Sequence, residues 1–193
     1  MLRQLIGDKT EKLLSRLASF LHQKKITPNM LTLTGLLINV IGAYCYANGF
    51  IVAGGLVIIL AGLFDMLDGA VARAGNIVSK LGAFTDSVVD RYSDFIIFSG
   101  VLAWYARAGD VGGTFLVLII ITGAFLVSYV RARAELVIDK CAVGFMERPE
   151  RIIILAAGSL FNFFTFALWF LAIATHLTAL YRIYYTCEQS QNK

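Results

Sequence analysis

Four aspartates in the first half of the chain have the side-chain type and the spacing of a metal site. They lie in the string D-x-x-D-G-x-x-A-R, eight residues, G-x-x-x-D-x-x-x-D, which runs from Asp65 through Asp68 and Asp86 to Asp90. Spacings of three and four residues put each pair on one face of a helix. Ionised carboxylates in an apolar segment are costly, and hard divalent cations prefer oxygen ligands. We therefore expect Mg²⁺ or Mn²⁺ here rather than solvated charges at helix ends.

The same string places small residues and an arginine between the two acidic pairs. Gly69 and Ala72 lie one turn apart on the face that carries Asp65 and Asp68. Small side chains there let a flat base or a phosphate approach the backbone closely, although they also serve tight helix packing in membranes. Arg73 suits a clamp on phosphate oxygens, and its alternative role is an anchor at the cytoplasmic membrane surface.

The composition is that of an integral membrane protein with one domain. Of 193 residues, 58% are hydrophobic and only 16% are charged, and the mean hydropathy of +0.73 is too high for an ordinary soluble domain. Three scattered cysteines argue against a disulfide framework. The first residues carry repeated charges, so we expect no signal peptide. The net charge of +4 suits loops that face anionic lipids and phosphorylated substrates and requires no nucleic acid.

Residues 1–23 repeat apolar positions at helical spacing, with lysines and arginines between them. This pattern predicts an amphipathic helix on a membrane surface, with packing on a partner domain as the alternative. We expect an all-α integral membrane protein. Its predicted parts are an amphipathic juxtamembrane helix over residues 1–25, a domain of six transmembrane helices over 26–187 and a cytoplasmic tail over 188–193.

Six apolar runs follow the first helix, at about residues 30–48, 51–72, 83–106, 111–136, 150–161 and 162–186. The fifth is short for a span of about 20 residues, and a single hairpin from Arg151 to Tyr185 is the alternative. If both termini are cytoplasmic, every lysine and arginine except Arg107 belongs to the inner side or to a span, as the positive-inside rule favours. This topology puts the aspartates at the cytoplasmic ends of the second and third spans, within reach of a nucleotide.

The aspartate string resembles the signature of the CDP-alcohol phosphotransferases, membrane enzymes that transfer a phosphatidyl-type group from a CDP-linked lipid to an alcohol. The similarity extends from Pro28 to Arg182. It implies that one or two divalent ions, normally magnesium or manganese, bridge the pyrophosphate, and that Asp90 is the general base for the acceptor hydroxyl. The implied metal ligands are Asp65, Asp68, Asp86 and Asp90. The implied contacts of the CDP-lipid are Asn29, Thr32, Asp68, Gly69, Ala72, Arg73 and Ser79. Family members are commonly homodimers.

Further arginines lie near the cytoplasmic ends of the last three predicted helices. They are Arg131, Arg133, Arg148, Arg151 and Arg182. Several guanidinium groups at one depth suit a phosphate dianion better than a neutral polyol, so we expect the acceptor to carry its own phosphate. Each arginine could instead be an interface anchor. These segments also resemble the branch of the family that makes phosphatidylinositol phosphate or archaetidylinositol phosphate from inositol phosphate.

We therefore expect an enzyme of the cytoplasmic membrane that transfers a phosphatidyl-type group to a phosphorylated polyol, inositol phosphate, and releases CMP. Glycerol 3-phosphate, which would give phosphatidylglycerol phosphate, is the second candidate acceptor, and a free polyol is the third. A divalent cation transporter would also carry aspartates in its spans. It would have no use for Gly69, Ala72 and Arg73, however, and would line a path instead of clustering its acids. The lipid tails of the donor, diacylglycerol or archaeal ether, stay open.

Overall fold

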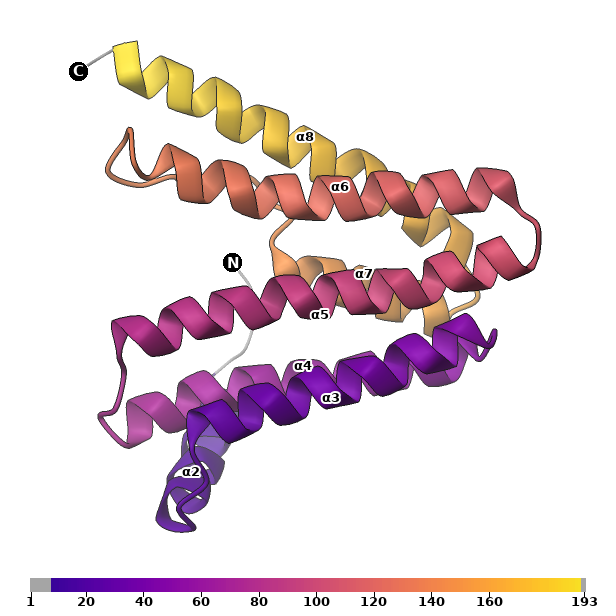
Figure 1. Ribbon diagram of the computed structural model, residues 1–193. Coiled ribbons are helices and arrows are strands. Elements are labelled where there is room, and N and C mark those ends of the chain that lie inside the picture. Colours follow the sequence, from indigo (N-terminus) through magenta and orange to yellow (C-terminus); the bar gives the residue numbers. More distant parts are fainter. Residues whose placement is uncertain (1–7, 192–193) are drawn as a thin grey trace.

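The computed structural model describes residues 8–191, and the regular elements in this part of the chain are all α-helices (Figure 1). In order they are α2 (Asp8–Gln23), α3 (Pro28–Ala47), α4 (Ile51–Ala74), α5 (Lys80–Arg107), α6 (Val111–Ala134), α7 (Arg148–Leu160) and α8 (Phe164–Gln191). Four of the described helices, α3, α4, α6 and α8, are long and apolar enough to cross a membrane. Large apolar side chains are exposed on them, including Leu37, Ile41, Leu56, Ile119 and Leu177. The described part of the chain is therefore all-α and has the helices of a membrane-integral protein.

The two other helices of the predicted six differ from simple spans. α5 has 28 residues, but Asp86, Asp90 and Asp94 make it less apolar than its neighbours. α7 has 13 residues, which at about 1.5 Å per residue gives a length of about 20 Å, less than the hydrocarbon thickness of about 30 Å. A turn containing Asn162, with φ of 59°, connects α7 to α8. Six transmembrane helices thus remain a prediction.

The predicted surface helix corresponds to α2, and its first residues, 1–7, lie outside the described part of the chain. Leu21 packs against a buried cluster that contains Val71 of α4. Leu17 and Phe20 are exposed. A helix with some apolar residues facing the protein and others facing outward is suited to a membrane surface, and this location of α2 stays a prediction.

Local capping fixes where the helices that carry the site begin. Pro28 occupies the first turn of α3, after Thr27, whose side chain accepts a hydrogen bond from the backbone of Met30. Ser79 caps α5 in the same way and accepts a hydrogen bond of 3.0 Å from the Gly82 backbone nitrogen. The start of α5 sets the register in which its aspartates face α4.

The helices form two groups that α5 and α7 connect. α3 packs on α4 and α5, α6 packs on α8 and α5, and α7 contacts both α4 and α8. Figure 1 shows α3 and α4 along one side of the molecule, α6 and α8 along the other, and α5 and α7 between them. Gly100 allows the close approach of α5 to α3, since a Cβ atom at this position would lie 2.6 Å from the Cα atom of Ala43.

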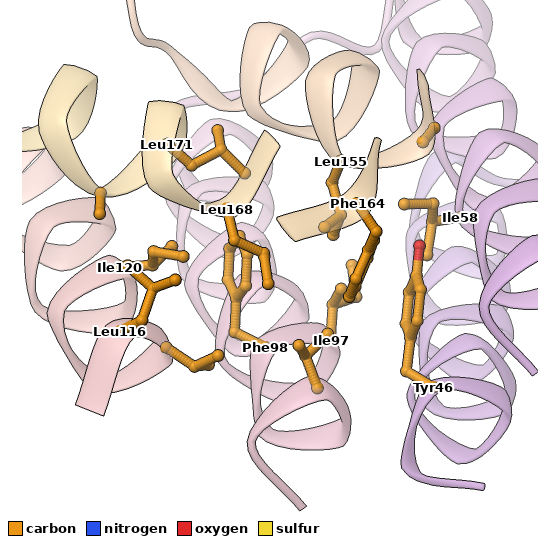
Figure 2. Close-up of a cluster of buried hydrophobic side chains, with 14 of the residues drawn as sticks. Tyr46, Ile58, Ile97, Phe98, Leu116, Ile120, Leu155, Phe164, Leu168 and Leu171 are labelled. Carbon is orange, nitrogen blue, oxygen red and sulfur yellow. The ribbon is translucent and has the colours of Figure 1, made fainter. Parts of the chain in front are cut away.

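A buried apolar cluster supports this arrangement (Figure 2). Every helix from α3 to α8 contributes residues to it, among them Tyr46, Ile58, Phe98, Ile120, Leu155 and Leu168. The hydroxyl groups of Tyr46 and Ser159 share a hydrogen bond of 2.8 Å inside the cluster, so a buried polar group is satisfied there. The cluster thereby holds together the helices that carry the aspartates and arginines of the site.

Candidate active site

Three carboxylates from two helices come together at one point. Asp65 and Asp68 of α4 and Asp86 of α5 each offer an oxygen atom, and these atoms lie within 4.8 Å of one another. Thr32 of α3 donates a hydrogen bond of 2.6 Å to Asp68, which orients that buried carboxylate. A cluster of oxygen donors without soft ligands suits magnesium or manganese. The residues present thus fit the divalent ion that the sequence predicts.

Asp90, the fourth predicted ligand, lies beside this cluster and is engaged by an arginine. Its Oδ1 atom is 2.7 Å from Nη1 of Arg148, and the same nitrogen is 2.7 Å from Oδ1 of Asp65. Arg91 lies 3.6 Å from the other Asp90 oxygen. One guanidinium group therefore forms ion pairs with two of the four predicted metal-binding carboxylates. The roles of Asp90 as ligand and as base remain predictions.

Asp94, one turn after Asp90 on α5, connects α5 to the start of α7. Its carboxylate pairs with the buried Arg151 and lies 3.6 Å from Nε of Arg148. Arg151 also donates a hydrogen bond of 3.1 Å to the carbonyl oxygen of Met146. Buried charges are tolerated when they are paired in this way. Arg148 and Arg151, both predicted to bind the acceptor, thus already have carboxylate partners.

A cavity of about 890 Å³ opens next to Asp90, bordered by α5, α6, α7 and α8. Its charged lining residues are Asp90, Arg91, Arg131, Glu135, Glu147, Arg148, Arg151 and Arg182. Four of the five arginines predicted for the acceptor are therefore brought together. Arg133 is exposed and lies outside this lining, because two residues along a helix turn a side chain by about 200°.

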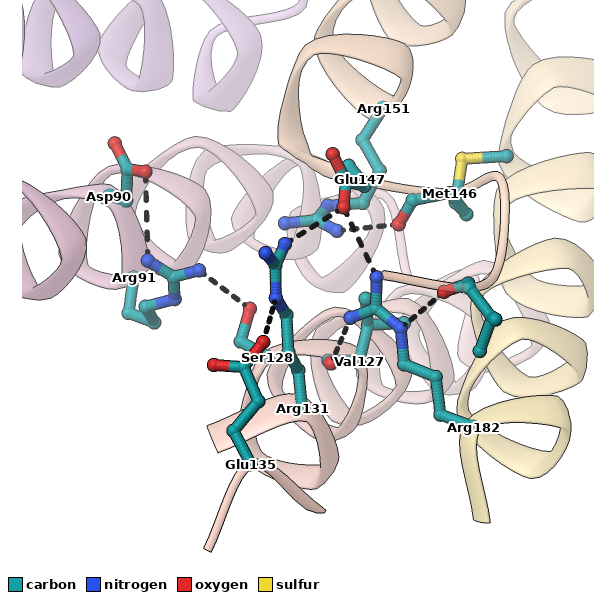
Figure 3. A network of polar contacts seen from close by, with 11 residues as sticks. Asp90, Arg91, Val127, Ser128, Arg131, Glu135, Met146, Glu147, Arg151 and Arg182 are labelled. Atoms are coloured by element: carbon teal, nitrogen blue, oxygen red, sulfur yellow. Dashed lines mark hydrogen bonds and ion pairs between the residues drawn. The ribbon is translucent and has the colours of Figure 1, made fainter. Parts of the chain in front are cut away.

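Arg131 and Arg182 meet at a carboxylate in this cavity (Figure 3). Glu147 accepts a hydrogen bond of 3.0 Å from Arg131 and one of 3.2 Å from Arg182 through the same oxygen, Oε1. Arg182 is buried and also donates to the carbonyl oxygens of Val127, at 2.7 Å, and Val143, at 2.8 Å. Sequence reasoning assigned no role to Glu147, although its place in the run E-R-P-E-R beside two predicted arginines was a usable signal.

A second cavity, of about 580 Å³, lies against the three-carboxylate cluster and is bordered by α2, α4 and α5. Its polar lining residues are Ser15, Ser19, Asp65, Asp68, Arg73 and Asp86, together with Gly69. The Arg73 guanidinium passes close to Gly69, since a Cβ atom there would lie 3.2 Å from Nη1 of Arg73. The sequence did not indicate that α2 contributes to this cavity.

Four residues predicted to contact the CDP-lipid lie outside the lining of this cavity. Asn29 is exposed near the start of α3 and Ala72 is half-buried on α4. Ser79 is the N-cap of α5. Thr32, a fourth predicted contact, reaches the site through its hydrogen bond to Asp68.

This arrangement of acidic cluster and flanking cavities can be compared with known proteins. The sequence model of the CDP-alcohol phosphatidyltransferase family matches residues 25–180. The chain belongs to this family. It is therefore a transferase, and the predicted family is confirmed.

The relatives of this CDP-alcohol phosphatidyltransferase cover nearly its whole length. It is 39% identical to the archaetidylinositol phosphate synthase of Pyrococcus horikoshii over 180 residues, which is 93% of each chain. It is 37% identical to the phosphatidylinositol phosphate synthase of Mycobacteroides abscessus over 184 residues, which is 90% of this chain and 83% of the relative.

Solved structures of the Mycobacterium tuberculosis phosphatidylinositol phosphate synthase have the same fold. The structure with CDP-DAG bound has a TM-score of 0.83 and 32% identity, and covers 91% of this chain and 94% of its own. The complex of that enzyme with manganese and citrate has a TM-score of 0.78 and 33% identity, and covers 90% of this chain and 88% of its own.

Proposed function

We propose that this CDP-alcohol phosphatidyltransferase moves a phosphatidyl-type group from a CDP-linked lipid to a hydroxyl group of inositol phosphate and releases CMP. The observation that carries the proposal is that the four aspartates border two cavities of different character, the three-carboxylate cluster the one and Asp90 the other. One is lined by the carboxylates, Gly69 and Arg73, and suits a nucleotide with its pyrophosphate. The other is lined by arginines and suits an acceptor that carries a phosphate dianion. The names of the relatives, synthases of inositol phosphate lipids, support this choice of acceptor.

The donor is proposed to bind in the cavity of about 580 Å³. CDP-DAG bound to the mycobacterial relative supports a CDP-lipid as the donor. Of the proposed contacts, Asp68, Gly69 and Arg73 line this cavity. Asn29, Thr32, Ala72 and Ser79 stay proposed contacts outside its lining. The close backbone approach at Gly69 and the guanidinium of Arg73 above it are the features of this cavity that suit a phosphate group.

A divalent ion, Mg²⁺ or Mn²⁺, is proposed to be held by Asp65, Asp68, Asp86 and Asp90. The manganese complex of the relative supports it, as does the oxygen-only cluster. When bound, the ion neutralises the pyrophosphate and stabilises the departing CMP. Thr32 holds Asp68 in a fixed orientation, and α3, α4 and α5 set the positions of the carboxylates.

In the proposed reaction the acceptor hydroxyl oxygen forms a bond to the lipid-bearing phosphorus of the donor. The bond from that phosphorus to the oxygen of CMP breaks, and CMP leaves with the bonding electrons. Asp90 accepts the proton of the hydroxyl group, which its place at the edge of the arginine-lined cavity favours. The proposed contacts of the acceptor phosphate are Arg131, Arg148, Arg151 and Arg182, which line this cavity, whereas Arg133 lies outside its lining.

Glycerol 3-phosphate is the second candidate acceptor, because the same guanidinium groups suit its phosphate equally well. The test uses the purified protein with CDP-diacylglycerol or its archaeal ether counterpart and divalent metal. CMP release is measured with inositol phosphate, glycerol 3-phosphate, free inositol and serine. Fastest release with inositol phosphate is the expected result. Faster release with free inositol or serine would exclude a pocket built for a phosphorylated acceptor.

For the membrane arrangement we propose six spans with both termini and the site on the cytoplasmic side of the cytoplasmic membrane, and a homodimer. The supporting observation is that the helix ends bordering the acidic cluster carry most of the positive charge. Cys187 is exposed near the end of α8, which provides a test. A membrane-impermeant thiol reagent should label it in inverted vesicles and not in intact cells. Labelling of Cys187 in intact cells would show that the C-terminal end of α8 lies on the outer side, which contradicts the proposed topology.

A further inference from the structure

Glu147 stands where an anionic ligand of the arginine-lined cavity would bind. Its Oε1 atom accepts hydrogen bonds from Arg131 of α6 and from Arg182 of α8 (Figure 3). A single oxygen atom that receives two guanidinium groups from separate helices is in the environment of a bound phosphate oxygen. We propose that Glu147 is an internal substitute for the acceptor phosphate, which occupies this position until a phosphorylated acceptor displaces it. The inference rests on the proposed function.

Neither arginine depends on Glu147 for its position. Arg182 donates through Nε to the Val143 carbonyl oxygen at 2.8 Å and through Nη1 to that of Val127 at 2.7 Å. Its guanidinium plane is therefore fixed by backbone atoms, and its remaining nitrogen points to Glu147. Arg131 is held from its own helix by Glu135 through a contact of 3.1 Å. What Glu147 adds at the meeting point is a negative charge.

The glutamate is also placed so that it can leave. Its side chain is 47% exposed, and Glu147 is the N-cap residue of α7 with no side-chain hydrogen bond to the first turn of that helix. Rotation into water would therefore keep the carboxylate solvated and leave the start of α7 unchanged. A phosphate dianion offers more charge and more acceptor atoms than a carboxylate and can replace it between the two arginines.

This exchange would select among acceptors. A neutral polyol has no charge with which to displace a carboxylate from two guanidinium groups, so Glu147 keeps the position closed to it. A phosphorylated polyol restores the charge balance as it enters. Glu147 is thus a specificity-determining residue, and its removal should make anion binding stronger instead of weaker.

The test compares the full-length wild-type protein with Glu147→Gln, using inorganic phosphate as the probe. Calorimetry on the purified protein should give a dissociation constant for phosphate about twofold to fivefold lower in the variant, the size expected when one exposed competing charge is removed. The KM for inositol phosphate should fall by a similar factor. Glu188→Gln is the control, because Glu188 is an exposed glutamate of α8 outside the cavity lining, and it should change phosphate binding less than twofold.

Each outcome separates the inference from the proposed function. Unchanged or weaker phosphate binding in a normally folded Glu147→Gln protein would overturn the inference, because Glu147 would then brace the arginines. A Glu147→Asp variant is used if Glu147→Gln fails to fold. Its shorter side chain would not let the carboxylate reach both arginines, so it should also bind phosphate more tightly than the wild-type protein. If wild-type protein used no phosphorylated acceptor while Glu147→Gln still bound phosphate more tightly, the proposed acceptor would be wrong, and Glu147 would occupy an anion site that serves a ligand other than the acceptor.

Discussion

Arg148 lies with its Nη1 atom 2.7 Å from an oxygen of Asp90 and 2.7 Å from an oxygen of Asp65. The guanidinium therefore sits between the two acidic pairs and reduces their mutual repulsion. A divalent ion bound by the same carboxylates would reduce that repulsion in the same way. We therefore expect Arg148 and the proposed ion to compete for Asp65.

Arg148→Met is expected to destabilise the metal-free protein by about 1–3 kcal/mol, since it leaves the half-buried Asp65 without its cation. Mn²⁺ should then raise the melting temperature more in the variant than in the wild-type protein, because the ion meets no competitor. Thermal unfolding with chelator and with Mn²⁺ measures both effects. Arg133→Met removes an exposed arginine and is the control. An equal rise in both proteins would show that Arg148 and the ion do not compete.

Thr32 is expected to tune metal affinity through its hydrogen bond of 2.6 Å to Asp68. Thr32→Val keeps the shape of the side chain and removes the donor, and losing such an outer contact typically weakens metal binding about 10–100-fold. The Mn²⁺ concentration for half-maximal CMP release should rise accordingly. Thr32→Ser restores the hydroxyl and should recover most of the affinity. Equal metal dependence in Val and Ser variants would show that this hydrogen bond does not affect the metal.

The two acidic positions should differ when each is changed to asparagine. Asp68→Asn removes a member of the three-carboxylate cluster and should weaken both CDP-lipid binding and turnover. Asp90→Asn should abolish turnover while donor binding stays largely intact, because the proposed role of Asp90 concerns the acceptor proton. Donor binding and CMP release are measured separately. Exhaustive chelation should stop CMP release in the wild-type protein. Wild-type rates in Asp90→Asn would remove this residue from catalysis.

The helices and the acidic cluster could be predicted because they depend on local patterns. Apolar runs of sufficient length determine α3, α4, α6 and α8, and spacings of three and four residues put the aspartates on common faces. The pairing of Arg148 with Asp90 could not be predicted, since it joins α7 to α5 across a distance in sequence that no local period covers. The same holds for the approach of α2 to the donor cavity.

Arg131 and Arg133 show that depth along the membrane and the direction of a side chain are separate properties. Arg131 and Arg133 end the same helix and were assigned to one pocket, yet only Arg131 lines the arginine-lined cavity in the described structure. Depth is set by position along a helix, whereas the direction of a side chain is set by helical phase. Neighbouring charges at one helix end therefore need not share a site.

The two arginines of α6 supply the last prediction, which tests the acceptor pocket directly. Arg131→Ala should raise the KM for inositol phosphate about tenfold or more, because a charge-assisted contact to phosphate is lost. Arg133→Ala should change that KM much less, since Arg133 is exposed and outside the cavity lining. Both variants keep the donor cavity, so CDP-lipid binding should be nearly unchanged in each. Steady-state CMP release at varied inositol phosphate measures the difference. If Arg133→Ala had the larger effect, the phosphate would bind on the face of α6 that carries Arg133 and points away from the cavity, and not in the cavity beside Asp90.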